Sequence, residues 1–171
     1  KELYKFHTEN VAAAKSLLPK RAICVHRRYM PSNHKANTCP TEFQVQRLLN
    51  QVYLSSRNSA DVTKRCVIIF SNDIERAKKE ISAECIQFVA GGVTDLNFRG
   101  VGEVRPKDDK IMAVSFTALA MCEDLIITCG TFGVFAGILH VGAGNVYHFN
   151  DPESLKIFGN DTVSKWKLEV S

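Results

Sequence analysis

Five short runs of apolar residues separated by helical patterns constrain the fold of this chain more than any other feature. The runs lie at residues 22–25, 66–70, 85–89, 125–128 and 145–149. Runs that are apolar at nearly every position are typical of strands buried on both faces, which occur in parallel sheets covered by helices. We therefore predict an α/β fold, a Rossmann-like parallel sheet with helices on both faces.

Helix signals fall between these runs. Thr41 and Gln44 have the spacing of a capping box, and apolar residues at helical spacing follow them. Cap-type residues at 71–73 precede a second predicted helix, and two more are predicted over about 111–121 and after Gly130. Residues 91–110 are polar and glycine-containing, which predicts a long loop.

Composition bounds the classes of function. The 171 residues are 45% apolar and 23% charged, as expected of one compact domain spanning residues 1–171 and not of a disordered chain. No apolar run approaches the ~18 residues of a membrane span. The net charge of the chain is a modest +4, and the basic residues are spread along the sequence. Both features argue against a nucleic-acid partner. A local basic pocket for a small phosphorylated ligand fits the charge distribution better.

The six cysteines include no C-x-x-C pair, so a zinc ribbon or a thioredoxin-like redox site is not expected. Four side chains near the first run have metal-binding chemistry, but their spacing matches no standard site, and we predict no metal there. These four are Cys24, His26, His34 and Cys39. Four cysteines lie in or beside apolar runs, where we predict small buried hydrophobic side chains, although the even count also permits disulfides. They are Cys24, Cys66, Cys85 and Cys129.

Ligands of open parallel sheets bind at the carboxyl ends of the strands. Polar or glycine-containing segments follow three of the predicted strands, and we expect them to meet in one cleft. They are His26-Arg27-Arg28, Ser71-Asn72-Asp73 and Cys129-Gly130-Thr131-Phe132-Gly133.

Two of these segments suit a diphosphate. Arg27 and Arg28 carry permanent charge and forked donors. The Gly130 segment ends a strand and opens a helix, where free N–H groups favour a phosphate, with Thr131 as the predicted cap. The chain has neither G-x-G-x-x-G before a helix nor a P-loop, which disfavours dinucleotide enzymes and nucleoside triphosphatases. The residues alone predict a binder of a sugar nucleotide or a similar diphosphate.

Each candidate also has a plainer interpretation. The arginines can form a solvated basic turn, and the Gly130 segment can be an ordinary helix start. Capping of its own helix is favoured for Asp73 over contact with a ribose or base. Ser115 either lines the cleft or faces solvent. His140 and His148 are predicted to be structural, and no catalytic residue can be assigned.

The three segments, in this order, resemble those of the galactoside α-1,2-fucosyltransferases (glycosyltransferase family 11), especially their divergent nematode-type members. The similarity covers residues from roughly 20 to 160. Residues 122–133, Cys-Glu-Asp-Leu-Ile-Ile-Thr-Cys-Gly-Thr-Phe-Gly, resemble the C-N-H-T-I-x-T-x-G-T-F-G block of that family. Val25-His26-Arg27-Arg28 resembles its H-x-R-R-G-D motif, whose arginine holds the donor β-phosphate. Residues 67–73 are similar to its segment in which a strand precedes Ser-Asn.

The resemblance implies an inverting enzyme that transfers L-fucose from GDP-fucose to a galactose hydroxyl of a glycan, in α-1,2 linkage, with neither metal nor other cofactor. It implies that this chain is the C-terminal, donor-binding lobe of a two-lobed GT-B glycosyltransferase. The acceptor lobe and a membrane anchor would then lie upstream, with the enzyme on the lumenal side of the Golgi membrane. The sequon at Asn160 is a weak indication of glycosylation.

The donor-binding residues that the resemblance implies are His26, Arg27, Arg28, Ser71, Asn72, Asp73, Ser115, Gly130, Thr131 and Phe132. The first motif lacks the residue between His26 and Arg27, so the phosphate role falls to Arg27, to Arg28 or to neither. Ser115 stands where the family usually carries an acidic residue. The alternative function is that of a non-catalytic relative serving as a carbohydrate- or nucleotide-binding module.

Overall fold

The computed structural model describes residues 8–29, 39–55, 65–90, 106–149 and 167–169. Within them the strands form one sheet in the order β3-β2-β1-β4-β5-β6, and every neighbouring pair is parallel. The strands are β1 Ile23–Arg27, β2 Val67–Ser71, β3 Ile86–Ala90, β4 Asp124–Ile127, β5 Val146–Phe149 and β6 Lys167–Glu169.

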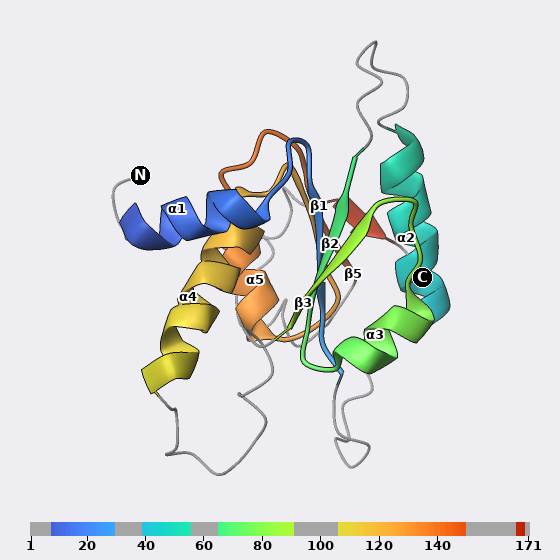
Figure 1. The fold of residues 1–171 in the computed structure, drawn as a ribbon. Coiled ribbons are helices and arrows are strands. Elements are labelled where there is room, and N and C mark those ends of the chain that lie inside the picture. Colours follow the sequence, from blue (N-terminus) through green and yellow to red (C-terminus); the bar gives the residue numbers. More distant parts are fainter. Residues whose placement is uncertain (1–7, 30–38, 56–64, 91–105, 150–166, 170–171) are drawn as a thin grey trace.

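Helices cover both faces of the sheet: α1, α4 and α5 pack on one face, and α2 and α3 on the other (Figure 1). Their bounds are α1 Thr8–Leu17, α2 Glu42–Ser55, α3 Ile74–Glu80, α4 Pro106–Met121 and α5 Thr131–Ile138. In the described segments, no helix combines the length and apolar character needed to cross a bilayer. The predicted α/β class, with a parallel sheet and helices on both faces, is confirmed.

Successive side chains of each strand enter different cores, as the pleat of a strand requires. In β1, Cys24 joins the core beneath α1, α4 and α5, whereas Val25 joins the core beneath α2 and α3. The same alternation places His26 on the α5 side of the sheet and Arg27 on the α2–α3 side. This separation decides what each residue contacts at the end of the strand.

Most predicted elements are confirmed to within a few residues. The capping box at the start of α2 is present: Thr41 N–H donates to Gln44 Oε1 at 2.8 Å, and Gln44 N–H donates to Thr41 Oγ1 at 3.3 Å. Helix α4 begins at Pro106, so the prediction that residues 91–110 form a loop is wrong from that residue on. Proline suits the first turn of a helix because the missing N–H would have no partner there. Helix α1 and strand β6 were not predicted.

Two disulfides join Cys39 to Cys129 and Cys66 to Cys85, while Cys24 is a free and buried thiol. The prediction of small buried side chains is therefore confirmed for Cys24 as a free thiol and for the burial of Cys129, whereas Cys66 and Cys85 are half-buried. The permitted alternative, a disulfide, holds for Cys66, Cys85 and Cys129. Strands β2 and β3 start side by side, with Val67 opposite Ile86, so the cysteines just before them are neighbours. Only the strand register reveals that proximity.

Candidate functional site at the carboxyl edge of the sheet

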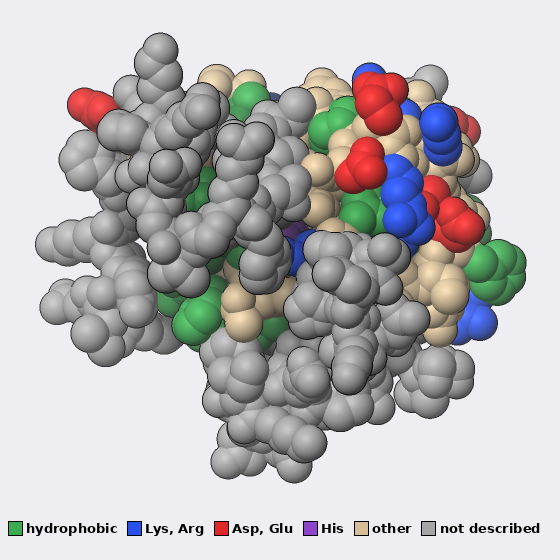
Figure 2. Space-filling model, turned by 90° about the horizontal axis from the view of Figure 1, so that it is seen from below, with side chains coloured by type: hydrophobic (Ala, Val, Ile, Leu, Met, Phe, Trp, Pro, Cys, Tyr) green, Lys and Arg blue, Asp and Glu red, His purple; other side chains and the backbone are tan. Residues whose placement is uncertain are grey.

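The order of the strands reverses beside β1, because β2 lies on one side of it and β4 on the other. Ligands of doubly wound sheets bind at such a point, outside the carboxyl ends of the strands. We call this border of the sheet the carboxyl edge; it faces down in Figure 1 and toward the viewer in Figure 2. In Figure 2 the visible charges near α3 are of both signs and form no continuous basic stripe.

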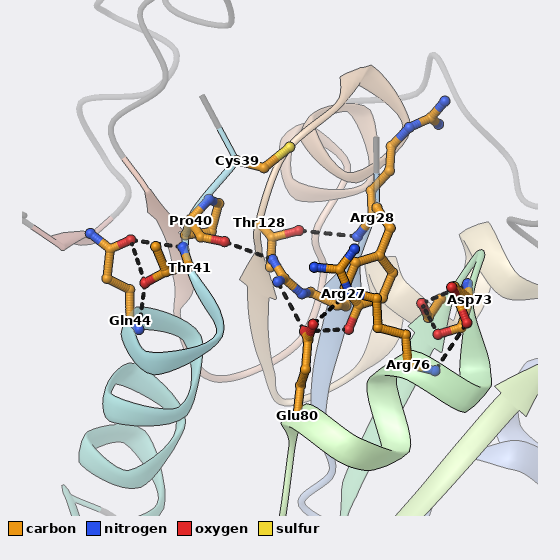
Figure 3. Close-up of polar contacts among 12 residues, drawn as sticks. Arg27, Arg28, Cys39, Pro40, Thr41, Gln44, Asp73, Arg76, Glu80 and Thr128 are labelled. Carbon is orange, nitrogen blue, oxygen red and sulfur yellow. Dashed lines mark hydrogen bonds and ion pairs between the residues drawn. The ribbon is translucent and has the colours of Figure 1, made fainter. Parts of the chain in front are cut away.

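Thr128 extends the pairing of β1 and β4 beyond their last ladder residues. Its N–H and its hydroxyl both donate to the carbonyl of His26, at 3.1 and 2.8 Å. The same hydroxyl oxygen accepts the N–H of Arg28 at 3.2 Å (Figure 3). These bonds fix the backbone of Arg28 relative to residues 129–131, which we call the glycine turn.

The side chain of Arg28 lies against the glycine turn. A Cβ atom added to Gly130 would meet Arg28 Cδ at 2.9 Å, and Gly130 has φ +89°, so this position suits glycine on both counts. Gly130 is the N-cap of α5 and supplies no side-chain cap, so this residue does not satisfy the first N–H groups of the helix. A guanidinium therefore lies beside the uncapped start of a helix, and both favour an anion.

The guanidinium of Arg28 forms no hydrogen bond or ion pair with any residue in the described ranges, and its buried Nε lacks a partner there. It extends away from Glu80 in Figure 3. Burial lowers the pKa of Arg28, because the charged form loses hydration without gaining a counter-ion. An arriving anion would supply that missing compensation.

Arg27, by contrast, is ion-paired on the opposite side of the sheet, although its buried Nε has no hydrogen-bond partner among the described residues. Only 4% of the residue is exposed, and its guanidinium donates to Glu80 Oε2 at 3.1 Å and to the carbonyl of Pro40 at 2.9 Å. It also lies over the ring of Tyr29, 4.6 Å from the centroid. Its charge is already neutralised, so it is poorly placed to serve a ligand.

Glu80 is the centre of this network. It accepts hydrogen bonds from the hydroxyl of Tyr29 and from Arg76 Nε, both at 2.6 Å, and Arg76 lies 4.5 Å from the centroid of the Tyr29 ring. Burial acts to raise the pKa of Glu80, but the hydrogen bonds from Tyr29, Arg76 and Arg27 outweigh it and hold the pKa below its usual value. The carboxylate thus stays charged and anchors the chain where it leaves β1.

The polar side chains at the end of β2 also form hydrogen bonds with other residues of the protein. Asn72 Oδ1 accepts the N–H of Tyr29 at 2.7 Å, and Asn72 Nδ2 donates to the carbonyl of Tyr29 at 2.9 Å. The Ser71 hydroxyl accepts the N–H of Asp73 at 3.1 Å, and Asp73 caps α3 by accepting the N–H of Arg76 at 3.0 Å. The favoured interpretation of Asp73 as a cap is confirmed. Asn72 therefore holds the ends of β1 and β2 together, while Ser71 and Asp73 fix the turn from β2 into α3.

His26 forms the floor beneath the first turn of α5. It is fully buried, its ring lies 5.7 Å from that of Phe132, and a Cβ on Gly133 would meet its Nδ1 at 2.5 Å. Burial, with a smaller effect of Arg28, lowers the pKa of His26 to about 3, so the ring is neutral at physiological pH. Its role in the described structure is to support the helix that opens at the glycine turn.

Three further predictions can be compared with the structure. The cap of α5 is Gly130, so the prediction that Thr131 caps the helix is wrong; Thr131 is the first helical residue and is exposed. Ser115 is 1% exposed within α4, which excludes a solvent-facing position. His148 is buried in β5, and His140 Nε2 lies 2.9 Å from the carbonyl of Cys122, which agrees with structural roles.

Cys39 forms a disulfide with Cys129, so its sulfur is not free to bind a metal together with Cys24, His26 and His34. Across the described ranges no three His, Cys, Asp or Glu side chains gather as a metal site would require. His34 and Asn160 lie outside the described residues.

Sequence reasoning assigned no role to several features that shape this edge: Tyr29, Glu80, Thr128, the Cys39–Cys129 disulfide, and the close approach of Gly133, a residue of the predicted segment, to His26. Thr128 and Gly133 flank the Gly130 motif, and that position was an available signal. Glu80 is separated from Arg27 by a strand and a helix, so no local pattern pointed to their contact.

The sequence profile described as Glycosyl transferase family 11 matches residues 21–162, a stretch that runs from just before β1 to beyond β5 and contains every residue of the carboxyl edge discussed here. No curated protein matches the chain. Because the match covers most of the chain, the protein belongs to glycosyl transferase family 11, the family of the α-1,2-fucosyltransferases.

Proposed function

We propose that the chain is the donor-binding domain of a fucosyltransferase that transfers L-fucose from GDP-fucose to a galactose hydroxyl of a glycan, with inversion and in α-1,2 linkage. The observation that carries this proposal is the Arg28 guanidinium, which has no partner among the described residues and lies beside the N-terminus of α5, where Gly130 supplies no side-chain cap. A nucleotide diphosphate bears the charge that such an arrangement favours.

In this proposal Arg28 and the N–H groups of the glycine turn hold the β-phosphate of the donor. As the bond from fucose to the β-phosphate breaks, negative charge grows on the departing GDP. A fixed guanidinium and helix N–H groups stabilise that charge without having to reorganise. Thr131, exposed at the first position of α5, is placed to add a hydroxyl donor, and Phe132 follows it in the same turn.

The other candidate residues act in this proposal by positioning. His26 supports α5, Arg27 anchors the end of β1 through Glu80, and Asn72 ties the end of β2 to Tyr29. Ser71 and Asp73 act locally, by holding the turn between β2 and α3. Ser115, which is buried within α4, is also given a positioning role in this proposal. The residue that takes the proton of the acceptor hydroxyl is not assigned.

The family suggests a two-lobed enzyme in which residues 1–171 form one domain, with an acceptor lobe and a Golgi anchor contributed by a preceding segment. The two disulfides support a lumenal location, since disulfides persist in oxidising compartments and are rare in the cytosol.

The second candidate is a non-catalytic relative that binds a nucleotide or a carbohydrate. It is favoured by one observation: Ser115 replaces the acidic side chain expected there, and its burial leaves no carboxylate at that position for a ribose or base.

The two candidates are separated by titrating the protein calorimetrically with GDP, GMP and UDP, and then by following labelled fucose from GDP-fucose to lactose. A fucosyltransferase binds GDP more tightly than GMP and UDP, and forms labelled product. Tight GDP binding without transfer, measured on protein that also carries the proposed acceptor lobe, supports the non-catalytic relative. If the folded protein binds none of the three nucleotides, a nucleotide-binding site is contradicted for both candidates.

A further inference from the structure

The Cys39–Cys129 disulfide joins two segments that meet at the carboxyl edge from 90 residues apart. Cys129 is the first residue of the glycine turn and is 3% exposed. Cys39 directly precedes Pro40 and the start of α2, and the two Cα atoms lie 5.2 Å apart. The bond thus ties helix α2, on one face of the sheet, to the turn that opens α5 on the other.

The Cys39 side of this bond is held firmly. The carbonyl of Pro40 accepts a hydrogen bond from buried Arg27, and Thr41 closes the capping box of α2. Arg27 in turn pairs with Glu80. Cys39 therefore extends from a segment whose position is fixed by a buried ion pair and by a capped helix.

Beyond Thr128, whose bonds fix the start of the glycine turn, few local interactions hold the residues that open α5. Gly130 has the backbone freedom of glycine at φ +89° and gives α5 no side-chain cap. The first hydrogen bond of the helix, from Val134 N–H to the carbonyl of Gly130, is long at 3.4 Å, and α5 has only eight residues. Local interactions alone leave this turn weakly specified.

We infer that the Cys39–Cys129 disulfide is a positioning element of the donor site: it holds the glycine turn in the conformation in which the N–H groups of α5 and the guanidinium of Arg28 face the same anion. This inference rests on the proposed function and adds residues to it. Cys39 and Cys129 touch no ligand in it and act through the turn, so their loss should affect the part of the affinity that the β-phosphate contributes.

The second disulfide offers a matched control. Cys66–Cys85 joins residues that precede β2 and β3, at the edge of the sheet opposite the glycine turn, and the two strands are already paired there. Removing either disulfide should lower the midpoint of thermal unfolding, since both restrict the unfolded chain. Only removal of Cys39–Cys129 should alter the donor site.

The test compares the wild-type protein with the double variants Cys39→Ala/Cys129→Ala and Cys66→Ala/Cys85→Ala, all well below their unfolding midpoints. Calorimetry gives the affinity for GDP and for GMP. We expect the first variant to bind GDP at least about tenfold more weakly, with a much smaller change for GMP, and the second to change by less than about twofold. A purely structural role of the bond would leave the ratio of GDP to GMP affinity unchanged.

Hydrogen exchange of a peptide covering residues 129–134 provides a readout that needs no ligand. We expect faster exchange in the Cys39/Cys129 variant than in the wild type, and no change in the Cys66/Cys85 variant. Cys39→Ser alone, which keeps the buried Cys129 side chain in place, serves if the double variant fails to fold.

Unchanged exchange in a folded Cys39/Cys129 variant overturns the inference, and so does an unchanged ratio of GDP to GMP affinity. Wild-type protein that does not bind GDP overturns the proposed function instead; the exchange measurement then still decides whether the disulfide holds the turn.

Discussion

Replacing the two adjacent arginines separately should produce opposite phenotypes. Arg28→Ala removes a guanidinium that has no partner in the described residues, whereas Arg27→Ala breaks a buried ion pair with Glu80. The first change should therefore weaken donor binding with little effect on stability. The second should destabilise the protein and act on the donor only indirectly.

The magnitudes follow from the contacts. A hydrogen bond to a charged group contributes about 1.5–3 kcal/mol, so losing one between Arg28 and the β-phosphate should weaken GDP binding roughly 10- to 150-fold. The Arg27–Glu80 pair is buried, with side-chain exposures of 4% and 5%. Removing one partner of such a pair costs about 3–5 kcal/mol. In a domain of this size that lowers the unfolding midpoint by roughly 6 to 20 °C.

Calorimetric titration with GDP and a thermal unfolding scan, applied to both variants, measure these effects. Arg27→Lys and Arg28→Lys are the matched controls, since each keeps the charge and loses the fork of donors. The reasoning is refuted if Arg27→Ala abolishes GDP binding in protein that is still folded while Arg28→Ala binds normally. That result would transfer the phosphate role to the arginine that the structure buries.

Three further variants test the supports of the site. Gly133→Ala should destabilise the protein by about 1–3 kcal/mol, because its Cβ would lie 2.5 Å from His26 Nδ1; urea unfolding measures this, and wild-type stability would contradict it. Asn72→Ala should cost about 1–3 kcal/mol by leaving the backbone N–H and carbonyl of Tyr29 without partners, with normal stability as the contrary result. His26 has a pKa of about 3 against an ordinary 6.5, so between these values the unfolded state binds more protons and stability is lost as pH falls. The loss should reach up to about 1.4 kcal/mol per pH unit. Urea unfolding at several pH values should show a shallower slope for His26→Asn, and an equal slope would argue against a neutral buried ring.

Local sequence patterns were sufficient to predict most strands and helices of the fold. The apolar runs became buried parallel strands because strands buried on both faces show no alternation. The capping box of Thr41 and Gln44 formed as predicted because both partners lie within one helical turn. Helix α1 was missed because its short, alanine-rich pattern acquires a buried face only by packing against α4.

The candidate site was predicted only in part. The Gly130 segment was correctly placed at the start of a helix, since glycine followed by a helical pattern is a local signal. The prediction of Thr131 as the cap is wrong because sequence cannot distinguish the last non-helical residue from the first helical one. The disulfide partners could not be deduced, because six cysteines allow many pairings.

The sequence by itself determined the α/β class, the succession of elements from β1 to β5, and the family, because these depend on patterns within short stretches of chain. Only the tertiary structure decided the roles of Arg27 and Arg28. The pleat of β1 sends Arg27 toward α3, where Glu80 neutralises it, and the next residue lies against Gly130. Which side of the sheet offers a counter-ion depends on elements that are distant in sequence and meet only when the chain folds.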